Sequence, residues 1–310
     1  MREQSIMILG AGGMVGSACL RAFQRDGWTR IVTPQRHLWD LTRQHRAEEC
    51  IRATRPDVIV MAAGKVGGIG ANMADQSRFL YQNAMMAMNV IHAAKVNGIE
   101  RVIYLGSSCA YPKHAVQPYH EEQLLTGPFE PTNAGYALAK CLGAEMCRHY
   151  SEQYGVRYTC LMPCNLYGPG DNYTETGHVV GMLMKRFHDA VMTGADTVTL
   201  WGSGTPVREF MHVDDLADAV VHLMGCDDVP SLVNVGSGEA VSIRVLAGII
   251  AKVTGFNGTI RCDRREVDGV SRKVMSSAVM RKLGWLPQIE LFHGLRQVYA
   301  QEFPALVEVA

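Results

Sequence analysis

The chain has no excess of charge of either sign. Its 310 residues include 30 lysines and arginines against 30 aspartates and glutamates, so the formal net charge is zero. A protein that binds nucleic acid or an anionic membrane surface usually presents a broad positive field, and this composition does not supply one. We therefore expect no nucleic-acid partner and no membrane partner, and any anionic ligand must be bound by local groups.

The sequence also lacks a hydrophobic run long enough to cross a bilayer. Its first apolar stretch, Ile6-Met-Ile-Leu9, is too short for the core of a secretory signal. The nine cysteines are odd in number and form no Cys-x-x-Cys pair, which argues against a disulfide framework and against a zinc site. These absences favour a reduced, cytoplasmic setting and predict no metal site.

Short apolar runs alternate with longer segments of helical spacing through the first half of the chain. The runs lie at 6–9, 31–33, 57–63, 101–105 and 157–162. This alternation predicts parallel strands joined by right-handed helical crossovers. Because the run 58–63 is apolar throughout, it fits a sheet that is covered on both faces. We predict an α/β fold with a doubly wound parallel sheet of the Rossmann type.

Beyond residue 165 the alternation gives way to clusters of glycine, proline, asparagine and threonine. Strand-like runs return at 197–201 and 232–235, and helical spacing returns at 214–224 and 241–254. We expect a dinucleotide-binding domain over 1–165, with returning segments near 210–236. A smaller, interleaved C-terminal lobe over 166–310 is expected to bind mainly the substrate.

A glycine-rich turn follows the first predicted strand and opens a helix. It reads Gly10-Ala-Gly-Gly-Met-Val-Gly16. Glycines let the backbone approach a pyrophosphate closely, and the free N–H groups at the start of a helix favour an anion. The turn predicts a dinucleotide site whose contacts are Gly10, Gly13, Met14, Val15 and Gly16.

The end of the second predicted strand bears on which nicotinamide cofactor binds. In NAD-binding proteins a carboxylate there usually accepts from the ribose hydroxyls. Here the strand ends Thr33-Pro-Gln-Arg36, and an arginine without a carboxylate beside it suits a ribose 2′-phosphate. Asp40, next to Leu41, is the competing candidate for the hydroxyl, although it lies late for that role. We expect NADPH to be preferred over NADH.

Three residues form the predicted catalytic centre. Tyr136 and Lys140 lie four apart in a segment of good helix formers, so they share one helix face. An ammonium beside a phenol lowers a tyrosine pKa that is ordinarily about 10, which makes the hydroxyl a usable acid or base. Ser107 follows the fourth predicted strand, at the edge where open α/β sheets bind ligands, and its hydroxyl can donate to a substrate carbonyl.

These residues, with several longer motifs, resemble the GDP-L-fucose synthases, a family of the extended short-chain dehydrogenase/reductase kind. The resemblance covers essentially the whole chain. Its specific pieces are Ala63-Gly-Lys-Val-Gly-Gly-Ile69, Tyr81-Gln-Asn83, Leu105-Gly-Ser-Ser-Cys-Ala-Tyr-Pro112, Glu130-Pro-Thr-Asn133, Met162-Pro-Cys-Asn-Leu-Tyr-Gly-Pro169, Trp201-Gly-Ser-Gly-Thr-Pro206 and Arg208-Glu-Phe210. Members of this family convert GDP-4-keto-6-deoxy-D-mannose to GDP-L-fucose by 3,5-epimerisation and NADPH-dependent 4-reduction.

The resemblance implies a role for each matching residue. Ser107, Tyr136 and Lys140 would form the reductase triad, while Cys109 and His178 would move protons during epimerisation. Further cofactor contacts would be Leu105, Gly106, Lys140, Pro163, Asn165 and His178. Arg186, Trp201 and Arg208 would bind the GDP portion, and a homodimer is the family expectation.

The implied chemistry is reasonable on its own terms. Hydrogens on the carbons beside a C4 ketone become acidic when hydroxyls hold the enolate oxygen, so the groups that serve reduction also serve epimerisation. A thiol and an imidazole have ordinary pKa values of about 8.5 and 6.5, which bracket neutrality and suit proton transfer. Three departures from the family pattern bear on the cofactor and sugar sites. Gly12 stands where the bacterial relatives have an arginine in the glycine loop, the stretch His178-Val-Val-Gly181 lacks an expected proline, and Ser276, downstream of Lys273, replaces an expected acidic residue.

Other readings of the sequence remain open. The same chemistry can act on a related GDP-4-keto-deoxy sugar of the colitose or 6-deoxyheptose type. A nucleotide-sugar 4-epimerase or dehydratase would hold its nicotinamide without net redox change, although dehydratases typically have acidic residues where this chain has Ser108-Cys109. A non-catalytic nucleotide sensor on the same fold is a further alternative.

Overall fold

A six-stranded sheet forms the centre of the computed structural model, which describes residues 3–263 and 269–304. All its strand pairs are parallel, and its order is β2-β1-β3-β4-β5-β9. The strands are β1 (Ile6–Leu9), β2 (Ile31–Val32), β3 (Val58–Met61), β4 (Arg101–Leu105), β5 (Arg157–Pro163) and β9 (Leu232–Val235). Nearly every residue of β1, β3, β4 and β5 is buried, as expected for a sheet covered on both faces.

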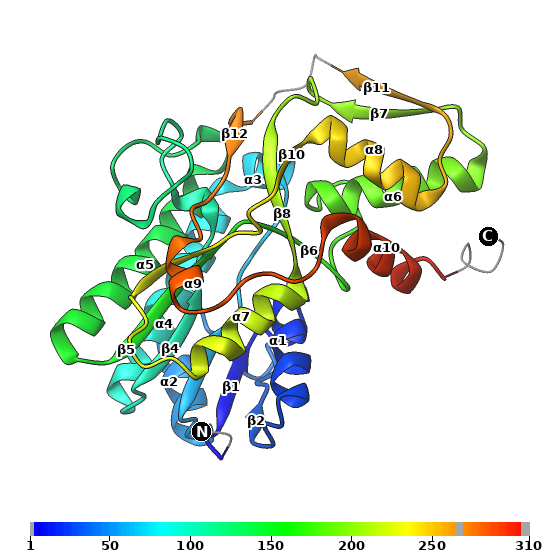
Figure 1. The fold of residues 1–310 in the computed structure, drawn as a ribbon. Coiled ribbons are helices and arrows are strands. Elements are labelled where there is room, and N and C mark those ends of the chain that lie inside the picture. Colours follow the sequence, from blue (N-terminus) through cyan, green and yellow to red (C-terminus); the bar gives the residue numbers. More distant parts are fainter. Residues whose placement is uncertain (1–2, 264–268, 305–310) are drawn as a thin grey trace.

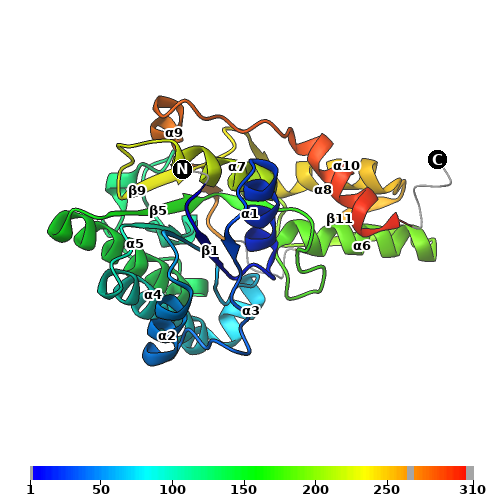
Figure 2. The same ribbon diagram turned by 90° about the horizontal axis from the view of Figure 1, so that it is seen from below.

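Helices cover both faces of this sheet (Figures 1 and 2). On one face lie α1 (Met14–Arg25) and α7 (Val213–Met224), and on the other lie α2 (Gln44–Thr54), α4 (Gln76–Val96) and α5 (Ala134–Tyr154). The predicted doubly wound α/β fold is therefore confirmed. The strand order reverses at β1, which lies between β2 and β3, and such a switch point is where open α/β sheets bind nucleotides.

A second layer of structure surrounds the strand β8 (Val207–His212). It pairs with β6 (Asn165–Tyr167), β10 (Ala240–Ser242) and β12 (Arg272–Lys273), and β7 (Thr197–Trp201) pairs separately with β11 (Thr259–Asp263). The helices α6 (Val179–Thr193), α8 (Ile243–Thr254) and α10 (Leu291–Glu302) enclose a hydrophobic core distinct from that of the large sheet. The short elements are α3 (Ile69–Ala74), α9 (Ala278–Lys282), η1 (Ser108–Ala110), η2 (Glu121–Gln123) and η3 (Pro131–Asn133).

The chain returns to the large sheet after it has entered this second layer. Residues of α7 and β9 belong to the core of the large sheet, as do Met275, Met280 and Trp285. The sequence divides the chain near residue 165, with returning segments near 210–236, and assigns the dinucleotide to one part and the substrate to the other. This assignment stays a prediction. None of the helices within the described residues is long and apolar enough to span a membrane.

The strands predicted from apolar runs are confirmed to within two residues at either end, and 6–9, 101–105, 197–201 and 232–235 match without change. The strand β8 is absent from the prediction. Its sequence, Val-Arg-Glu-Phe-Met-His, includes Glu209, which is fully buried and accepts from the N–H groups of Met275 (2.6 Å) and Gly238 (2.9 Å). Because the charged residue Glu209 lies within this strand, the run of apolar residues that predicts a buried strand is interrupted.

Candidate active site

The glycine turn after β1 forms a close-packed cradle at the switch point. Gly10 has φ +86°, and a Cβ on it would lie 2.7 Å from the backbone nitrogen of Ala63, which follows β3. A Cβ on Gly16 would overlap the carbonyl oxygen of Gly10. Gly13 caps α1 without a side-chain hydrogen bond, and the first turn contains no acidic residue. The N–H groups of that turn are thus available to an anion such as a pyrophosphate, and the cradle fits the predicted dinucleotide.

The segment after β2 places Arg36 and Asp40 in different local roles. Arg36 is exposed. The Asp40 carboxylate accepts from both the N–H (3.0 Å) and the hydroxyl (2.7 Å) of Thr42, and these bonds hold its pKa below the ordinary value. Asp40 is therefore engaged in its own turn, which favours Arg36 as the group that selects the cofactor.

Lys140 ties the helix α5 to the strand β4. Its side chain is buried, and its ammonium donates to the carbonyl oxygen of Leu105 at 2.7 Å. The ammonium also lies 5.8 Å from the ring centroid of Tyr136, one turn earlier on α5. Burial lowers the pKa of Lys140 to about 8. Tyr136 and Lys140 share a helix face, as predicted, and that face meets the end of β4.

The lowered tyrosine pKa that the sequence predicts is not found. Burial raises the pKa of Tyr136 above its ordinary value, the charge of Cys109 raises it further, and a hydrogen bond from Ser107 acts in the opposite direction. The physical reason is that Lys140 directs its ammonium to the Leu105 carbonyl, while the phenol is largely removed from water. Tyr136 therefore holds its proton at neutral pH and is suited to donate it.

Ser107 and Cys109 lie where β4 ends and η1 begins. The Ser107 hydroxyl oxygen accepts from the backbone N–H of Cys109 at 3.2 Å, and the Ser107 side chain also interacts with the Tyr136 phenol and the Cys109 thiol. Gly106 before them has no room for a side chain, since a Cβ would meet the sulfur atoms of Met162 and Cys160 on β5. The turn that contains both residues therefore packs closely against β5, at the carboxyl end of β4.

The Cys109 thiol lies beside two cations. The Lys273 ammonium is 3.5 Å from the Cys109 sulfur, and Lys273 pairs in register with Arg208 on the neighbouring strand. Burial disfavours the thiolate, but Lys273, the Ser107 hydroxyl and Arg208 outweigh it, so the net pKa of Cys109 is lowered. The site thus contains one thiol that is easier to ionise than an ordinary cysteine.

His178 is the residue just before α6, at its N-cap position. Its side chain is exposed to solvent although protein atoms surround it densely enough to lower its pKa. The loop before it contacts the motif at 63–69, because the Gly68 N–H donates to the Thr176 carbonyl at 3.0 Å. That motif is in turn held by buried Asn83, whose amide bonds the N–H (2.9 Å) and carbonyl (3.0 Å) of Lys65.

The three predicted substrate residues fall into two groups. The Arg186 guanidinium stacks on Trp201 at 5.0 Å from the ring centroid, and it also binds the Glu175 carboxylate and the Thr199 carbonyl. Arg208 is placed on β8 beside Lys273 instead. Arg186 lies eight residues along α6 from His178, about 12 Å by helical rise.

Three of the remaining predicted cofactor residues lie at strand ends near the catalytic turn, and three lie elsewhere. Pro163 ends β5, Leu105 ends β4, and Asn165 begins β6 and donates to the carbonyl of Glu209 at 2.9 Å. Met14 and Val15 open α1, and Leu41 packs against the core of the large sheet.

Sequence reasoning missed Lys273 and Glu175 as members of these groups. Their partners, Cys109 and Arg186, are 164 and 11 residues away, and neither residue belongs to a recognisable spacing. Asn83 lay within a quoted motif, but only the fold shows that it holds the loop at 63–69. No spacing pattern in the sequence therefore connects these residues to the groups that they contact.

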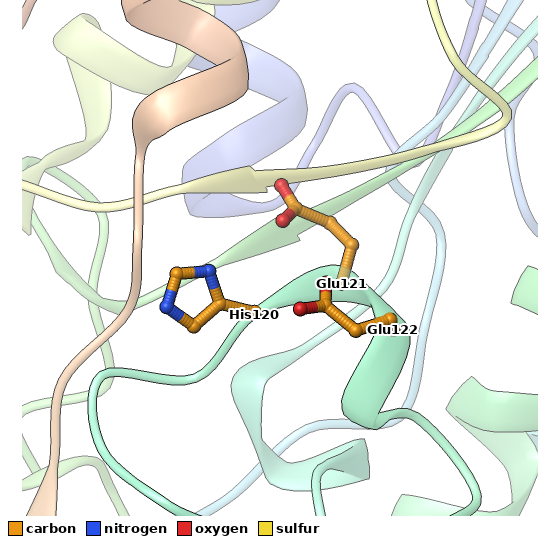
Figure 3. A group of neighbouring side chains, drawn as sticks. All are labelled: His120, Glu121 and Glu122. Carbon is orange, nitrogen blue, oxygen red and sulfur yellow. The ribbon is translucent and has the colours of Figure 1, made fainter.

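Two features lie away from this site. A cavity of about 390 Å³ opens at the opposite edge of the large sheet, where β3, β4 and β5 begin, and Asp57, Arg101 and Arg157 line it. His120, Glu121 and Glu122 are neighbours at η2, with potential ligand atoms within 4.8 Å of one another (Figure 3). Glu121 reaches toward β9 and accepts from the Asn234 N–H at 2.9 Å, so its carboxylate holds η2 against the sheet.

Comparisons with known proteins place the chain in a family. The model of the NAD dependent epimerase/dehydratase family matches residues 6–236. GDP-L-fucose synthase 1 of Arabidopsis thaliana is 44% identical over 299 residues, covering 96% of this chain and 93% of the relative. GDP-L-colitose synthase of Yersinia pseudotuberculosis is 36% identical over 293 residues, covering 94% of this chain and 95% of the relative.

A solved structure agrees with these matches. The GDP-mannoheptose C4 reductase of Campylobacter jejuni with NADP bound superimposes with a TM-score of 0.87 at 29% identity, covering 97% of this chain and 99% of the other. The level of identity and the near-complete coverage exceed what a shared fold alone requires. The chain is therefore a member of the NAD dependent epimerase/dehydratase family and, within it, of the GDP-L-fucose synthases.

Proposed function

We propose that this protein catalyses the 3,5-epimerisation and NADPH-dependent 4-reduction of GDP-4-keto-6-deoxy-D-mannose to GDP-L-fucose. The observation that carries the proposal is the placement of an activated thiol, Cys109, in the same turn as Ser107 and beside Tyr136. A reductase alone needs no such thiol. Epimerisation next to the same ketone needs a base, and such a thiol can supply it.

The residues divide the work as follows. Ser107 and Tyr136 donate hydrogen bonds to the ketone oxygen and stabilise the enolate that forms when an adjacent carbon loses its proton. Cys109 and His178 remove and return protons on opposite faces of the sugar ring. Tyr136, which keeps its proton at neutral pH, later protonates the C4 oxygen, and Lys140 holds a positive charge near the phenol.

The dinucleotide is proposed to bind at the glycine cradle and at the ends of β4 and β5. When bound, its nicotinamide supplies the hydride for C4. Arg36 is proposed to bind the ribose 2′-phosphate, because it is exposed after β2 while Asp40 is engaged by Thr42. Arg36→Ala should reduce the preference for NADPH over NADH by at least tenfold, and Arg43→Ala, which removes another exposed arginine nearby, should not.

A second candidate is the same chemistry on a related GDP-4-keto-deoxy sugar. The match to a colitose synthase and the fold match to a heptose reductase support it, while the higher identity to a fucose synthase favours the first candidate. The test compares kcat/KM for GDP-4-keto-6-deoxy-D-mannose with that for its 3-deoxy and heptose analogues. A higher value for an analogue would replace the first candidate with the second.

The division of labour within the chain is also proposed. Residues 1–165 with 210–236 would bind the dinucleotide, and 166–310 would bind mainly the GDP-sugar, with Arg186 and Arg208 balancing the diphosphate charge. All nine cysteines are unpaired, which supports a reduced, cytoplasmic setting. Neither nucleic acid nor a membrane is proposed as a partner.

We propose a homodimer formed through α4 and α5, which lie side by side (Figure 1). Each helix exposes large apolar side chains: Tyr81 and Met88 on α4, and Leu138 and Tyr154 on α5. Light scattering of the purified protein should give twice the chain mass. Leu138→Glu should shift it toward the single-chain mass, and a monomeric wild type would refute the dimer.

A further inference from the structure

The segment that contains Lys273 is fixed to its neighbours on two sides. On one side, Arg272 and Lys273 pair with β8, and the Val207 N–H donates to the Ser271 carbonyl at 2.8 Å. On the other side, the Val274 N–H donates to the Gln117 side chain at 2.8 Å. Because the backbone is held before and after Lys273, its side chain leaves a fixed point of the fold.

Further bonds extend this fixation along the chain. The Val274 carbonyl accepts from the Tyr119 N–H, and the Ser276 N–H donates to the Tyr119 carbonyl, both at 2.8 Å. The Met275 N–H donates to buried Glu209 on β8 at 2.6 Å. These bonds hold the backbone on both sides of Lys273, whose ammonium lies against the catalytic turn.

The contact itself joins Lys273 to Cys109 across 164 residues of sequence, with 3.5 Å between nitrogen and sulfur. The other polar groups around the thiol are the Ser107 hydroxyl, the Arg208 guanidinium, and the phenols of Tyr136 and Tyr119. Arg208 is in register with Lys273 on the adjacent strand, so both cations that favour the thiolate come from the pair of strands β8 and β12. The two phenols are neutral and supply no competing charge at neutral pH.

The net effect of these neighbours is an easier ionisation of Cys109, in spite of its burial. An opposite charge within about 4–6 Å typically shifts a pKa by about 1–3 units. Lys273 has the larger electrostatic effect of the two cations and also donates a hydrogen bond to the sulfur. It is therefore the principal candidate for the group that sets the charge of the thiol.

We infer that Lys273 is a positioning residue that stabilises the thiolate form of Cys109, the form that acts as the base of epimerisation. The inference rests on the proposed function, because it assigns Cys109 to proton removal beside a ketone. In the step, the carbon–hydrogen bond breaks, a sulfur–hydrogen bond forms, and the electron pair moves to the ketone oxygen held by Ser107 and Tyr136. Lys273 contacts the thiol, so in this proposal its effect on epimerisation passes through Cys109.

The test measures the thiol directly and without substrate. Alkylation of Cys109 by iodoacetamide is followed against pH in the full chain, with mass spectrometry of the peptide that contains Cys109. In the wild type, the midpoint should lie below the ordinary thiol value of about 8.5. Lys273→Met should raise the midpoint by about 1 pH unit, because it removes the charge and keeps the length. Lys273→Arg, which keeps the charge, should restore most of the shift.

Lys252→Met, on an exposed position of α8, is the matched control and should leave the midpoint unchanged. Lys273→Gln repeats the comparison with a polar side chain, and a thermal melt of each variant shows that it folds. An unchanged midpoint in folded Lys273→Met or Lys273→Gln overturns the inference. So does an equal shift in Lys273→Arg, because charge would then not be the cause.

A second readout separates this inference from the proposed function. Deuterium incorporation into the 4-keto sugar is measured against pH for the wild type, Lys273→Met and Cys109→Ser. In Lys273→Met, the rate of deuterium exchange should rise at a higher pH than in the wild type. The size of this shift should match the shift of the alkylation midpoint. If alkylation shifts while Cys109→Ser still exchanges at the wild-type rate, Lys273 controls the thiol but the catalytic role is refuted.

Discussion

The Lys140 ammonium and the Leu105 carbonyl oxygen are 2.7 Å apart, and this bond joins the second turn of the catalytic helix to the last residue of β4. Ser107 follows Leu105 by two residues, so the bond also fixes the distance between the two elements that supply the hydroxyls. A buried ammonium needs such a partner, because an unpaired charge away from water is costly. Lys140 therefore has a structural role as well as an electrostatic role.

Lys140→Met should lower the rate of NADPH oxidation by about 10²–10⁴-fold. It removes both the charge near Tyr136 and the bond to β4, while the buried methylene groups keep their volume. In the wild type, the rate should also fall as pH rises through about 8, because burial lowers the Lys140 pKa to that value and the charge is then lost. Stopped-flow absorbance of NADPH against pH measures both effects. A pH-independent wild-type rate between 7 and 9 would refute the role of the charge.

Gly16→Ala should weaken NADPH binding by at least tenfold, because its Cβ would overlap the Gly10 carbonyl and force the cradle open. Gly12→Ala is the matched control, since a Cβ on Gly12 has no neighbour within 4 Å in the described structure. Titration of each variant by nucleotide fluorescence gives the dissociation constants. Equal weakening in the two variants would show that the loop does not bind the dinucleotide through close approach.

Trp201→Ala should lower the affinity for GDP by about two- to fivefold, because the ring that stacks on Arg186 is lost. Glu175→Gln should raise that affinity, since the Glu175 carboxylate competes with an incoming diphosphate for the same guanidinium. Isothermal titration with GDP measures both changes. A loss of affinity in Glu175→Gln would mean that Glu175 orients Arg186 for the ligand instead of competing with it.

Asp171→Asn should stabilise the protein at pH 8 and not at pH 5. Burial raises the folded-state pKa of Asp171 to about 7, and its Oδ2 has no hydrogen-bond partner within the described residues. Because the folded pKa exceeds the unfolded one, the folded state binds the proton more tightly. The stability from this proton is full below about pH 4 and is lost as pH rises through 7.

The amide stays neutral at both pH values, so the expected gain in Tm at pH 8 is about 2–4 °C, with none at pH 5. Calorimetry of the two proteins at the two pH values measures it. Asp228→Asn, at an exposed position, is the control and should show no pH-dependent difference. A gain of equal size at pH 5 would contradict the account of Asp171.

The sequence predicted best those features whose residues all lie within one helix or strand. Apolar runs marked the strands of the large sheet, and the four-residue spacing placed Tyr136 and Lys140 on one face of α5. The strand β8 was missed because buried Glu209 interrupts its pattern. The tyrosine pKa was predicted in the wrong direction, because spacing shows that a cation is near but not that it is bound elsewhere.

The sequence predicted least well the contacts between residues from distant segments of the chain. Lys273 reaches Cys109 only because β12 pairs with β8, and that pairing depends on backbone bonds that no side-chain pattern records. Glu175 likewise meets Arg186 through the turn that precedes α6. Residues of this kind are found from the fold, because they are identified by a contact in space and not by a spacing in the sequence.

The most direct measurement incubates the protein with GDP-4-keto-6-deoxy-D-mannose and NADPH in deuterated water, and follows both NADPH absorbance and the NMR spectrum of the sugar. The account predicts stoichiometric loss of NADPH, with deuterium at C3 and C5 of a product of L-galacto configuration. Deuterium exchange without NADPH loss would show an epimerase that does not reduce, and NADPH loss without deuterium would show a simple reductase. Either result would contradict the central claim that one site performs both reactions.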